Sequence, residues 1–100
     1  MTTPLFDAVV HPDQRLRICA FLLANDDVAF AVLRESLAVS ESALSRQLKA
    51  LVEAGYVTLR KERGVPRPRT WVALTEGGRR ACLGHLAALQ AMVDGAARPS

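Results

Sequence analysis

The spacing of the apolar residues changes from a helical to a strand pattern at Gly55, and that change limits the folds open to the chain. Before it, Leu44, Leu48 and Leu51 recur every three or four residues, which predicts an apolar stripe along a helix. After it, apolar and polar residues alternate over 57–60, which predicts a strand. Glycine accepts the left-handed backbone that closes a helix. The chain therefore has to pass directly from a helix into a sheet.

The segments on either side of this junction predict a mostly helical chain with one hairpin. Phe30, Leu33 and Leu37 have helical spacing, and Ser40, a favourable N-cap, follows shortly after them. Two helices joined by so short a turn have helix-turn-helix spacing. The loop at 64–68 holds a glycine and two prolines, so it cannot lie inside a paired ladder. The expected elements are helices from Pro12 to the turn at 25–27, at 30–37, at 41–54 and at 75–96, and strands at 57–60 and 69–74.

Length and composition fit one cytoplasmic domain. The chain has 100 residues, half of them apolar, which is enough for a single modest core. No apolar stretch approaches the ~20 residues needed to span a bilayer. The N-terminus lacks the basic and then apolar pattern of a secretion signal. Two cysteines, Cys19 and Cys82, lie at apolar helical positions and are too few for a disulfide scaffold, which favours a reducing compartment.

The positive charge of the chain is concentrated in one segment. The whole chain has a formal net charge of +3, whereas residues 40–80 carry nine Lys and Arg against four Glu, a net charge of +5. The remaining residues have a net charge of −2. Such a distribution is typical of a protein that binds a polyanion, although many domains have one basic side.

The exposed face of the helix at 41–54 has the chemistry of a DNA-reading surface. Small and hydroxyl residues come first, and two cations follow one turn apart. Small residues let a backbone approach the major groove, Arg can contact guanine bidentately, and Lys can contact phosphate. The alternative is an ordinary solvated helix face. The candidate residues on this helix are Ser40, Ser42, Ala43, Ser45, Arg46, Gln47 and Lys49, with Arg46 expected to provide the main sequence readout.

The predicted hairpin strengthens the nucleic-acid interpretation. Its cations have only Glu62 against them, and Pro66 and Pro68 stiffen the loop that presents Arg67. Arg67 is therefore the candidate to reach a minor groove or a neighbouring phosphate. The alternative is an ordinary solvent-exposed hairpin that does not bind nucleic acid. The hairpin candidates are Arg60, Lys61, Arg63, Arg67 and Arg69, and Trp71 is expected on the outer face of the sheet with its role open.

These segments resemble a known family of regulators. Residues 40–57, SESALSRQLKALVEAGYV, resemble the recognition helix and first wing strand of MarR- and ArsR-type winged-helix regulators. Residues 67–79, RPRTWVALTEGGR, resemble the second wing strand and the start of the last helix, and 15–18 fit the first long helix. The similarity covers roughly residues 11–90 and is greatest to compact, stand-alone MarR-like proteins.

The resemblance implies an α+β, mostly helical fold: a winged helix-turn-helix with a two-stranded wing and a C-terminal dimerisation helix. We expect a single DNA-binding domain over 1–100, with a winged-helix core at 11–74 and contributions to dimerisation from 1–24 and 75–97. The implied function is that of a homodimeric transcription regulator, a repressor, that binds double-stranded DNA. Its operator would be pseudo-palindromic, with half-sites about one turn apart.

The two terminal helices are expected to form the dimer interface. The first helix is apolar on two faces, and so short a chain has little mass to cover both. The last helix, expected to begin after the N-cap Thr75 although Gly77 and Gly78 weaken its first turn, has apolar residues at spacings of four, three and four. Packing within one subunit is the alternative. The interface candidates are Leu16, Ala20, Leu23, Cys82, Leu86, Leu89 and Val93.

Other functions have less support in the sequence. His85 stands alone on the last helix and Cys82 has no neighbouring cysteine, so no metal site is predicted, and buried packing of both cysteines is favoured over thiol sensing. No nucleophile elbow or phosphate loop indicates an enzyme, and no cofactor is expected. The alternatives are a winged-helix protein-interaction module and a non-specific nucleic-acid-binding protein. An unidentified small effector between the dimerising helices and the core is a further alternative.

Overall fold

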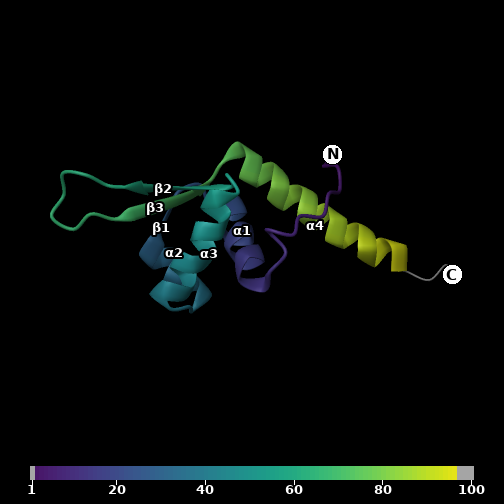
Figure 1. The fold of residues 1–100 in the computed structure, drawn as a ribbon, viewed down its shortest axis with the longest axis horizontal. Helices are drawn as coiled ribbons and strands as arrows, with labels where there is room; N and C mark the ends of the chain where they lie inside the picture. Colours follow the sequence, from purple (N-terminus) through teal and green to yellow (C-terminus); the bar gives the residue numbers. More distant parts are fainter. Residues whose placement is uncertain (1, 97–100) are drawn as a thin grey trace.

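The computed structural model describes residues 2–96, which form four helices and a three-stranded antiparallel sheet (Figure 1). A helical body lies in the middle, the hairpin projects from one end, and the last helix projects from the other. This arrangement confirms the predicted α+β winged helix. The elements are α1 (Asp13–Ala24), β1 (Val28–Ala29), α2 (Phe30–Leu37), α3 (Glu41–Glu53), β2 (Val57–Lys61), β3 (Thr70–Leu74) and α4 (Glu76–Ala96).

The helix-turn-helix is formed by α2 and α3. The turn between them begins at Ala38, which has a left-handed backbone with φ 53°. Ser40 is the N-cap of α3, and its hydroxyl accepts a hydrogen bond from the backbone N–H of Ala43 at 3.1 Å. Gly55 follows the helix with φ 79°, in the region that favours glycine. These caps confirm both predicted ends of this helix. The first helix differs slightly, since Pro12 is its N-cap and not its first residue.

The sheet contains a strand that the sequence did not predict. Its strand order is β1-β3-β2, and β1 pairs with β3 through Val28↔Val72 and Ala29↔Trp71. The expected two-stranded wing is therefore the outer part of a three-stranded sheet. The hairpin pairing runs from Val57↔Leu74 to Lys61↔Thr70, where the wing has left the body.

The core lies where α1, α2, α3 and the base of the sheet meet. Along β2, Val57 is 2% exposed but Leu59 is 47% exposed, so the alternation that placed both on one face does not bury both. Leu59 lies farther along the projecting hairpin and lines an open groove beside α3. The fully buried aliphatic side chains are Val10, Ile18, Leu22, Leu33, Leu44, Leu48, Leu51 and Val72.

The start of α4 packs tightly on the turn that follows α3. Thr75 caps the helix as predicted, because its Oγ1 accepts a hydrogen bond from the backbone N–H of Gly78 at 2.9 Å. The same hydroxyl donates to the carbonyl oxygen of Gly55 at 2.7 Å. A Cβ on Gly78 would overlap the backbone carbonyl of Tyr56. Gly78 is therefore required by a close backbone approach, whereas the sequence indicated only a weakened helix start.

The molecule is long for its size. Its principal extents are 62 × 25 × 21 Å, and its radius of gyration is 15.3 Å. A compact domain of this length would have a radius of gyration of about 13 Å. The excess reflects the wing at one end and the outer half of α4 at the other (Figure 1). Residue 97 of the predicted dimerising segment lies outside the described residues.

None of the helices in the part of the chain that the structure describes is long and apolar enough to cross a membrane.

Candidate nucleic-acid interface

Helix α3 presents the cations that the sequence analysis assigned to DNA reading. Its apolar stripe of Leu44, Leu48 and Leu51 is at most 1% exposed, which fixes the opposite face toward solvent. On that face Arg46 and Lys49 are exposed. The exposed hydroxyl residues around them are Ser40, Ser42 and Ser45, and Ala43 is half-buried beside them.

Gln47 does not lie free on this face. It is half-buried, and its Oε1 accepts a hydrogen bond from Nε of Arg15 on α1 at 3.1 Å. The amide oxygen of Gln47 is therefore engaged within the protein, and the expectation that Gln47 helps to read bases stays a prediction that now concerns its amide N–H groups. No local pattern marks this contact, because the two residues are 32 positions apart.

The wing presents a second group of cations. The side chains of Arg60, Lys61, Arg63, Arg67 and Arg69 are all exposed. The hydrogen bond from the N–H of Glu62 to the carbonyl of Arg69, at 2.8 Å, extends the hairpin beyond β2 and β3. The guanidinium of Arg69 lies 5.9 Å from the centroid of the half-buried Trp71 ring. This is a cation–π distance, so Trp71 supports one of the wing cations.

The cations of α3 and the wing are not neutralised by the fold. Within residues 2–96, the ion pairs are Arg17–Asp13 and Arg80–Glu76, both between exposed side chains one helical turn apart. No ion pair of that part of the chain involves Arg46, Lys49 or a wing cation. These charges are therefore available to an external anion.

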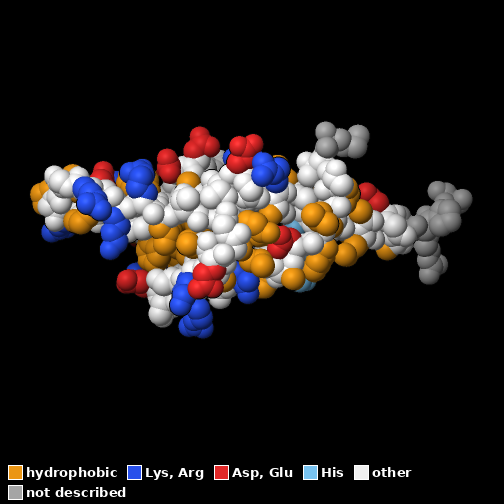
Figure 2. Space-filling view, turned by 45° about the horizontal axis from the view of Figure 1, so that its top comes forward, with side chains coloured by type: hydrophobic (Ala, Val, Ile, Leu, Met, Phe, Trp, Pro, Cys, Tyr) orange, Lys and Arg blue, Asp and Glu red, His pale blue; other side chains and the backbone are white. Residues whose placement is uncertain are grey.

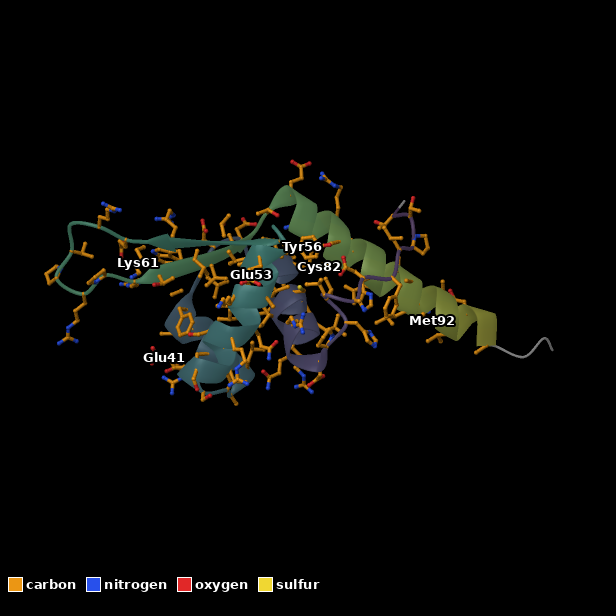
Figure 3. The ribbon with its side chains drawn as sticks, viewed as in Figure 1. Glu41, Glu53, Tyr56, Lys61, Cys82 and Met92 are labelled. Atoms are coloured by element: carbon orange, nitrogen blue, oxygen red, sulfur yellow. The ribbon has the colours of Figure 1, made fainter. Side chains whose placement is uncertain are left out.

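A groove separates α3 from the wing. Lys49 lines it from the helix and Lys61 from the wing, and Phe30, Val52 and Leu59 give it apolar walls. In Figure 2 blue cationic side chains gather on the wing at the left, and an orange hydrophobic area lies between the wing and the helices. Figure 3 labels Lys61 on the wing and Glu41 at the start of α3. The two cationic elements thus face a common hollow.

The opposite end of the molecule is organised by the N-terminal segment, which runs beside α4 (Figure 1). The backbone N–H of Leu5 donates to the carbonyl of Gly84 at 2.9 Å. The backbone N–H of Asp7 donates to Nδ1 of His85 at 2.9 Å, and Asp7 Oδ2 accepts from the hydroxyl of Tyr56 at 2.5 Å. Asp7 thereby joins the N-terminal segment to both α4 and the α3–β2 turn.

Two histidines lie together within this segment and α4. His85 is fully buried, its Nε2 lies 3.1 Å from Nδ1 of His11, and the ring of Phe6 packs against both imidazoles. Because His85 Nδ1 accepts from Asp7, neutral His85 carries its proton on Nε2 and donates it to His11. The sequence analysis noted only that His85 stands alone on the last helix, and its partner His11 comes from the segment before α1. The pair is separated by 74 positions.

The environment of this cluster shifts two pKa values. Burial lowers the pKa of His85 below its ordinary value, and the nearby charge of His11 lowers it further, against a smaller opposing effect of Asp7. The hydrogen bond to Asp7, together with burial, raises the pKa of Tyr56 to about 12. Both groups are therefore neutral near pH 7, as their hydrogen bonds require.

The two cysteines pack against each other in the protomer's own core. Both are free and buried, as predicted, on α1 and α4. The neighbouring Cys82 thiol, together with burial, raises the pKa of Cys19. The prediction that Cys82 lies in a dimer interface is wrong, because its side chain is 0% exposed and is covered by the same subunit.

Helix α4 and the N-terminal segment share an exposed apolar surface. Of the predicted interface residues, Leu86 and Val93 are 36% and 65% exposed, and Leu89 is half-buried. On α1, Leu16 and Leu23 are half-buried against the core, and Ala20 is exposed. The sequence analysis missed the contribution of the N-terminal segment. The terminal apolar surface consists of Leu5, Phe6, Leu83, Leu86, Met92 and Val93.

Residues 2–96 contain no group of three or more His, Cys, Asp or Glu side chains placed to hold a metal ion. A hollow lined by Leu5, Tyr56, Arg80 and Leu83 lies between the N-terminal segment and α4.

Comparison with known proteins identifies the class of this chain. The family model of the winged helix DNA-binding domain matches residues 14–93, so the chain belongs to that family. This match confirms the winged-helix DNA-binding class that the recognition-helix and wing sequences predicted.

Solved structures of other regulators share the fold. A transcriptional regulator homologue from Pyrococcus horikoshii OT3 is 29% identical, with a TM-score of 0.83 over 87% of this chain and 86% of that one. NadR in complex with 4-hydroxyphenylacetate is 24% identical, with a TM-score of 0.72 over 87% of this chain and 61% of that one. Overoxidized AbfR bound to DNA is 18% identical, with a TM-score of 0.72 over 80% of this chain and 58% of that one. No curated protein sequence matched the chain.

Proposed function

We propose that this protein is a homodimeric repressor that binds a pseudo-palindromic operator in double-stranded DNA. The observation that supports this most directly is the set of exposed cations on α3 and the wing, none of which is ion-paired within the described residues. A protein-interaction module would have no need to keep these charges free on both elements.

The cations of α3 and of the wing make different contributions to DNA binding. Arg46 projects from the middle of α3, where a recognition helix meets base edges, and a guanidinium can contact guanine bidentately. Lys49 and the wing cations contact phosphates, which contributes affinity without sequence information. Arg67, between Pro66 and Pro68 at the wing tip, reaches the minor groove or its phosphates. Binding should therefore weaken steeply with salt.

A second copy of the chain covers the terminal apolar surface. In Figure 2 hydrophobic side chains follow α4 and its neighbouring segment on the right of the molecule, away from the cationic wing. Pairing two copies through this surface leaves both α3 helices free, and two-fold symmetry then requires related half-sites about one DNA turn apart. Repression would follow because a dimer bound at the operator blocks that site.

Binding of a small effector is a further prediction. The hollow between the N-terminal segment and α4 supports this prediction, because Tyr56 and a proposed dimerising helix both line it. A compound bound there would contact both the terminal apolar surface and Tyr56.

The test of the operator is selection of bound duplexes from a random DNA pool, sequenced after rounds at two salt concentrations. We expect enrichment of a two-fold-related motif with half-sites one turn apart. Retention that is lost at the higher salt with no enriched motif would support non-specific nucleic-acid binding instead. Absence of retention at both salt concentrations would leave the protein-interaction module.

The test of the dimer is sedimentation equilibrium of the wild type and Leu86→Glu. We expect a dimer for the wild type and a monomer for the variant, because a charge would be buried against apolar groups. Ala91→Glu is the matched control, since residue 91 is exposed and lies about 140° around the same helix. A wild-type monomer at all concentrations would contradict the dimer.

A further inference from the structure

Arg15 joins three segments of the molecule through one guanidinium group. Its Nε donates to Oε1 of Gln47 on α3 at 3.1 Å, and its Nη1 donates to the carbonyl oxygen of Val9 in the N-terminal segment at 3.0 Å. The side chain itself belongs to α1 and is half-buried. Arginine suits this position because its planar group presents several donors in fixed directions.

The Val9 end of this bridge is itself held in place. The backbone N–H groups of Val9 and Val10 donate to Oδ1 of Asp7 at 2.8 and 3.2 Å. Val10 is 0% exposed within the core, and the other oxygen of Asp7 accepts from Tyr56. The carbonyl that receives Arg15 therefore belongs to an anchored loop, so the guanidinium has a fixed position from which to hold Gln47.

The Gln47 end of the bridge lies beside the residue that we assign to base reading. Gln47 follows Arg46 directly on α3, and Leu44 and Leu48 fix the buried side of this helix. The remaining freedom of α3 is a small rotation or slide on α1, which the Arg15–Gln47 hydrogen bond opposes. A bidentate contact to a base tolerates such displacement poorly, whereas flexible Lys contacts to phosphate tolerate it well.

We propose that Arg15 is a positioning residue for sequence readout: it holds α3 through Gln47 so that Arg46 meets its base, and it does not itself contact DNA. This inference rests on the proposed function. It assigns Gln47 to the support of α3, where the sequence analysis assigned it to direct reading. The alternative role for Arg15 is a phosphate contact, which would depend on its charge and not on Gln47.

Variants of both partners separate these roles. Arg15→Met removes both the charge and the hydrogen bonds. Arg15→Lys keeps the charge but lacks the planar group with several fixed donors, and Gln47→Met removes the hydrogen-bond acceptor. The matched control is Arg17→Met, since Arg17 lies on the same helix, is exposed and forms an ion pair with Asp13 one helical turn away. For each variant we would measure affinity for the selected duplex and for a scrambled duplex, over a series of salt concentrations.

We expect Arg15→Met and Arg15→Lys each to lower the ratio of the two affinities by about tenfold, the effect of one hydrogen bond to a charged group. The salt slope should stay at its wild-type value. Gln47→Met should have the same effect, and the Arg15→Met/Gln47→Met double variant should lose no more than either single variant, because both remove one contact. Arg17→Met should leave the ratio unchanged.

Other outcomes would overturn the proposal. If Arg15→Lys keeps the wild-type ratio of the two affinities while Arg15→Met has a reduced salt slope, Arg15 is a phosphate contact. Additive losses in the double variant would show that Arg15 and Gln47 act separately. A wild-type protein that prefers no duplex would instead contradict the proposed function, before any variant is considered. If Arg15→Met does not fold by circular dichroism, Arg15→Lys and Gln47→Met still decide between these roles.

Discussion

The two ends of the molecule use their polar side chains in opposite ways. At the end formed by α3 and the wing, Arg46, Lys49 and Arg67 are exposed and have no ion-pair partner within the described residues. At the end formed by α4 and the N-terminal segment, Asp7 and His85 are bound to each other and to neighbouring groups in the fold. Figure 3 labels Lys61 at the first end and Met92 at the second, on either side of the body.

This difference separates the side chains that act on a partner from those that hold the protein together. Substitutions of the exposed cations on α3 and the wing should change DNA binding and leave folding stability unchanged. Substitutions around Asp7, Gly78 and His85 should change stability first. The following four predictions test that separation, beginning with the largest effect.

Gly78→Ala should destabilise the fold by about 3 kcal/mol, because the added Cβ would overlap the carbonyl of Tyr56 and push α4 off the body. Gly77→Ala is the control, since its Cβ would meet only ordinary contacts at 3.8 and 3.9 Å and should stabilise the helix by about 0.5–1 kcal/mol. Urea unfolding of both variants measures the difference. Equal stabilities would mean that α4 can shift at no cost.

Arg46→Ala should weaken binding to the selected duplex by ~1–3 kcal/mol and relax specificity at one base position. Its free energy of unfolding should stay within about 0.5 kcal/mol of the wild type, because the side chain is exposed. Titration against duplexes that differ at single positions provides the measurement. Arg46→Lys should lose the same discrimination, since lysine cannot make the bidentate contact. An equal loss on all sequences would make Arg46 a phosphate contact.

Arg67→Ala should reduce the slope of log affinity against log salt by about one, without changing the preferred sequence. The residue lies in the loop between β2 and β3, and this loop forms the outer end of the projecting wing (Figure 1). Arg80→Ala serves as the control because Arg80 lies on α4 and is paired with Glu76. A wild-type slope in Arg67→Ala would remove the wing tip from the contact surface.

Acidification should destabilise the protein through His85. Burial lowers the pKa of His85 below its ordinary value of 6.5, so the unfolded chain takes up the proton first as the pH falls. The stability that neutral His85 provides is complete above pH 6.5 and is lost as the pH falls toward its pKa in the folded protein. Unfolding free energies across this range measure the effect. His85→Asn should lack this pH dependence, whereas His11→Asn should retain it. If His85→Asn also retains the pH dependence, another titrating group is its cause.

Local patterns in the sequence predicted the helices and their ends well. The bounds of α2 agree with the helical spacing of Phe30, Leu33 and Leu37, and the caps at Ser40 and Thr75 are formed by the predicted residues. Each of these features depends on residues within one or two turns of each other. The exposure of Arg46 was likewise predictable, because its opposite face carries the apolar stripe.

Contacts between distant segments were not predictable in the same way. Strand β1 has only two residues, too few to establish a period, and it exists because β3 offers it an edge. The His11–His85 pair and the Arg15–Gln47 hydrogen bond join positions far apart in the chain, and no local pattern marks them. Cys82 has the same helical spacing as its exposed neighbours, and its burial depends on where α1 lies.

The hydrogen bonds from Leu5 to Gly84 and from Asp7 to His85 also have a consequence for local unfolding. The N-terminal segment has exposed side chains at Leu5 and Phe6, yet its amide groups are tied to the middle of α4. In native-state hydrogen exchange, the amide protons of residues 5 and 7 should therefore be protected together with those of α4, as one cooperative unit. The segment before α1 then behaves as part of the last helix, and the first and last parts of the chain unfold in a single step.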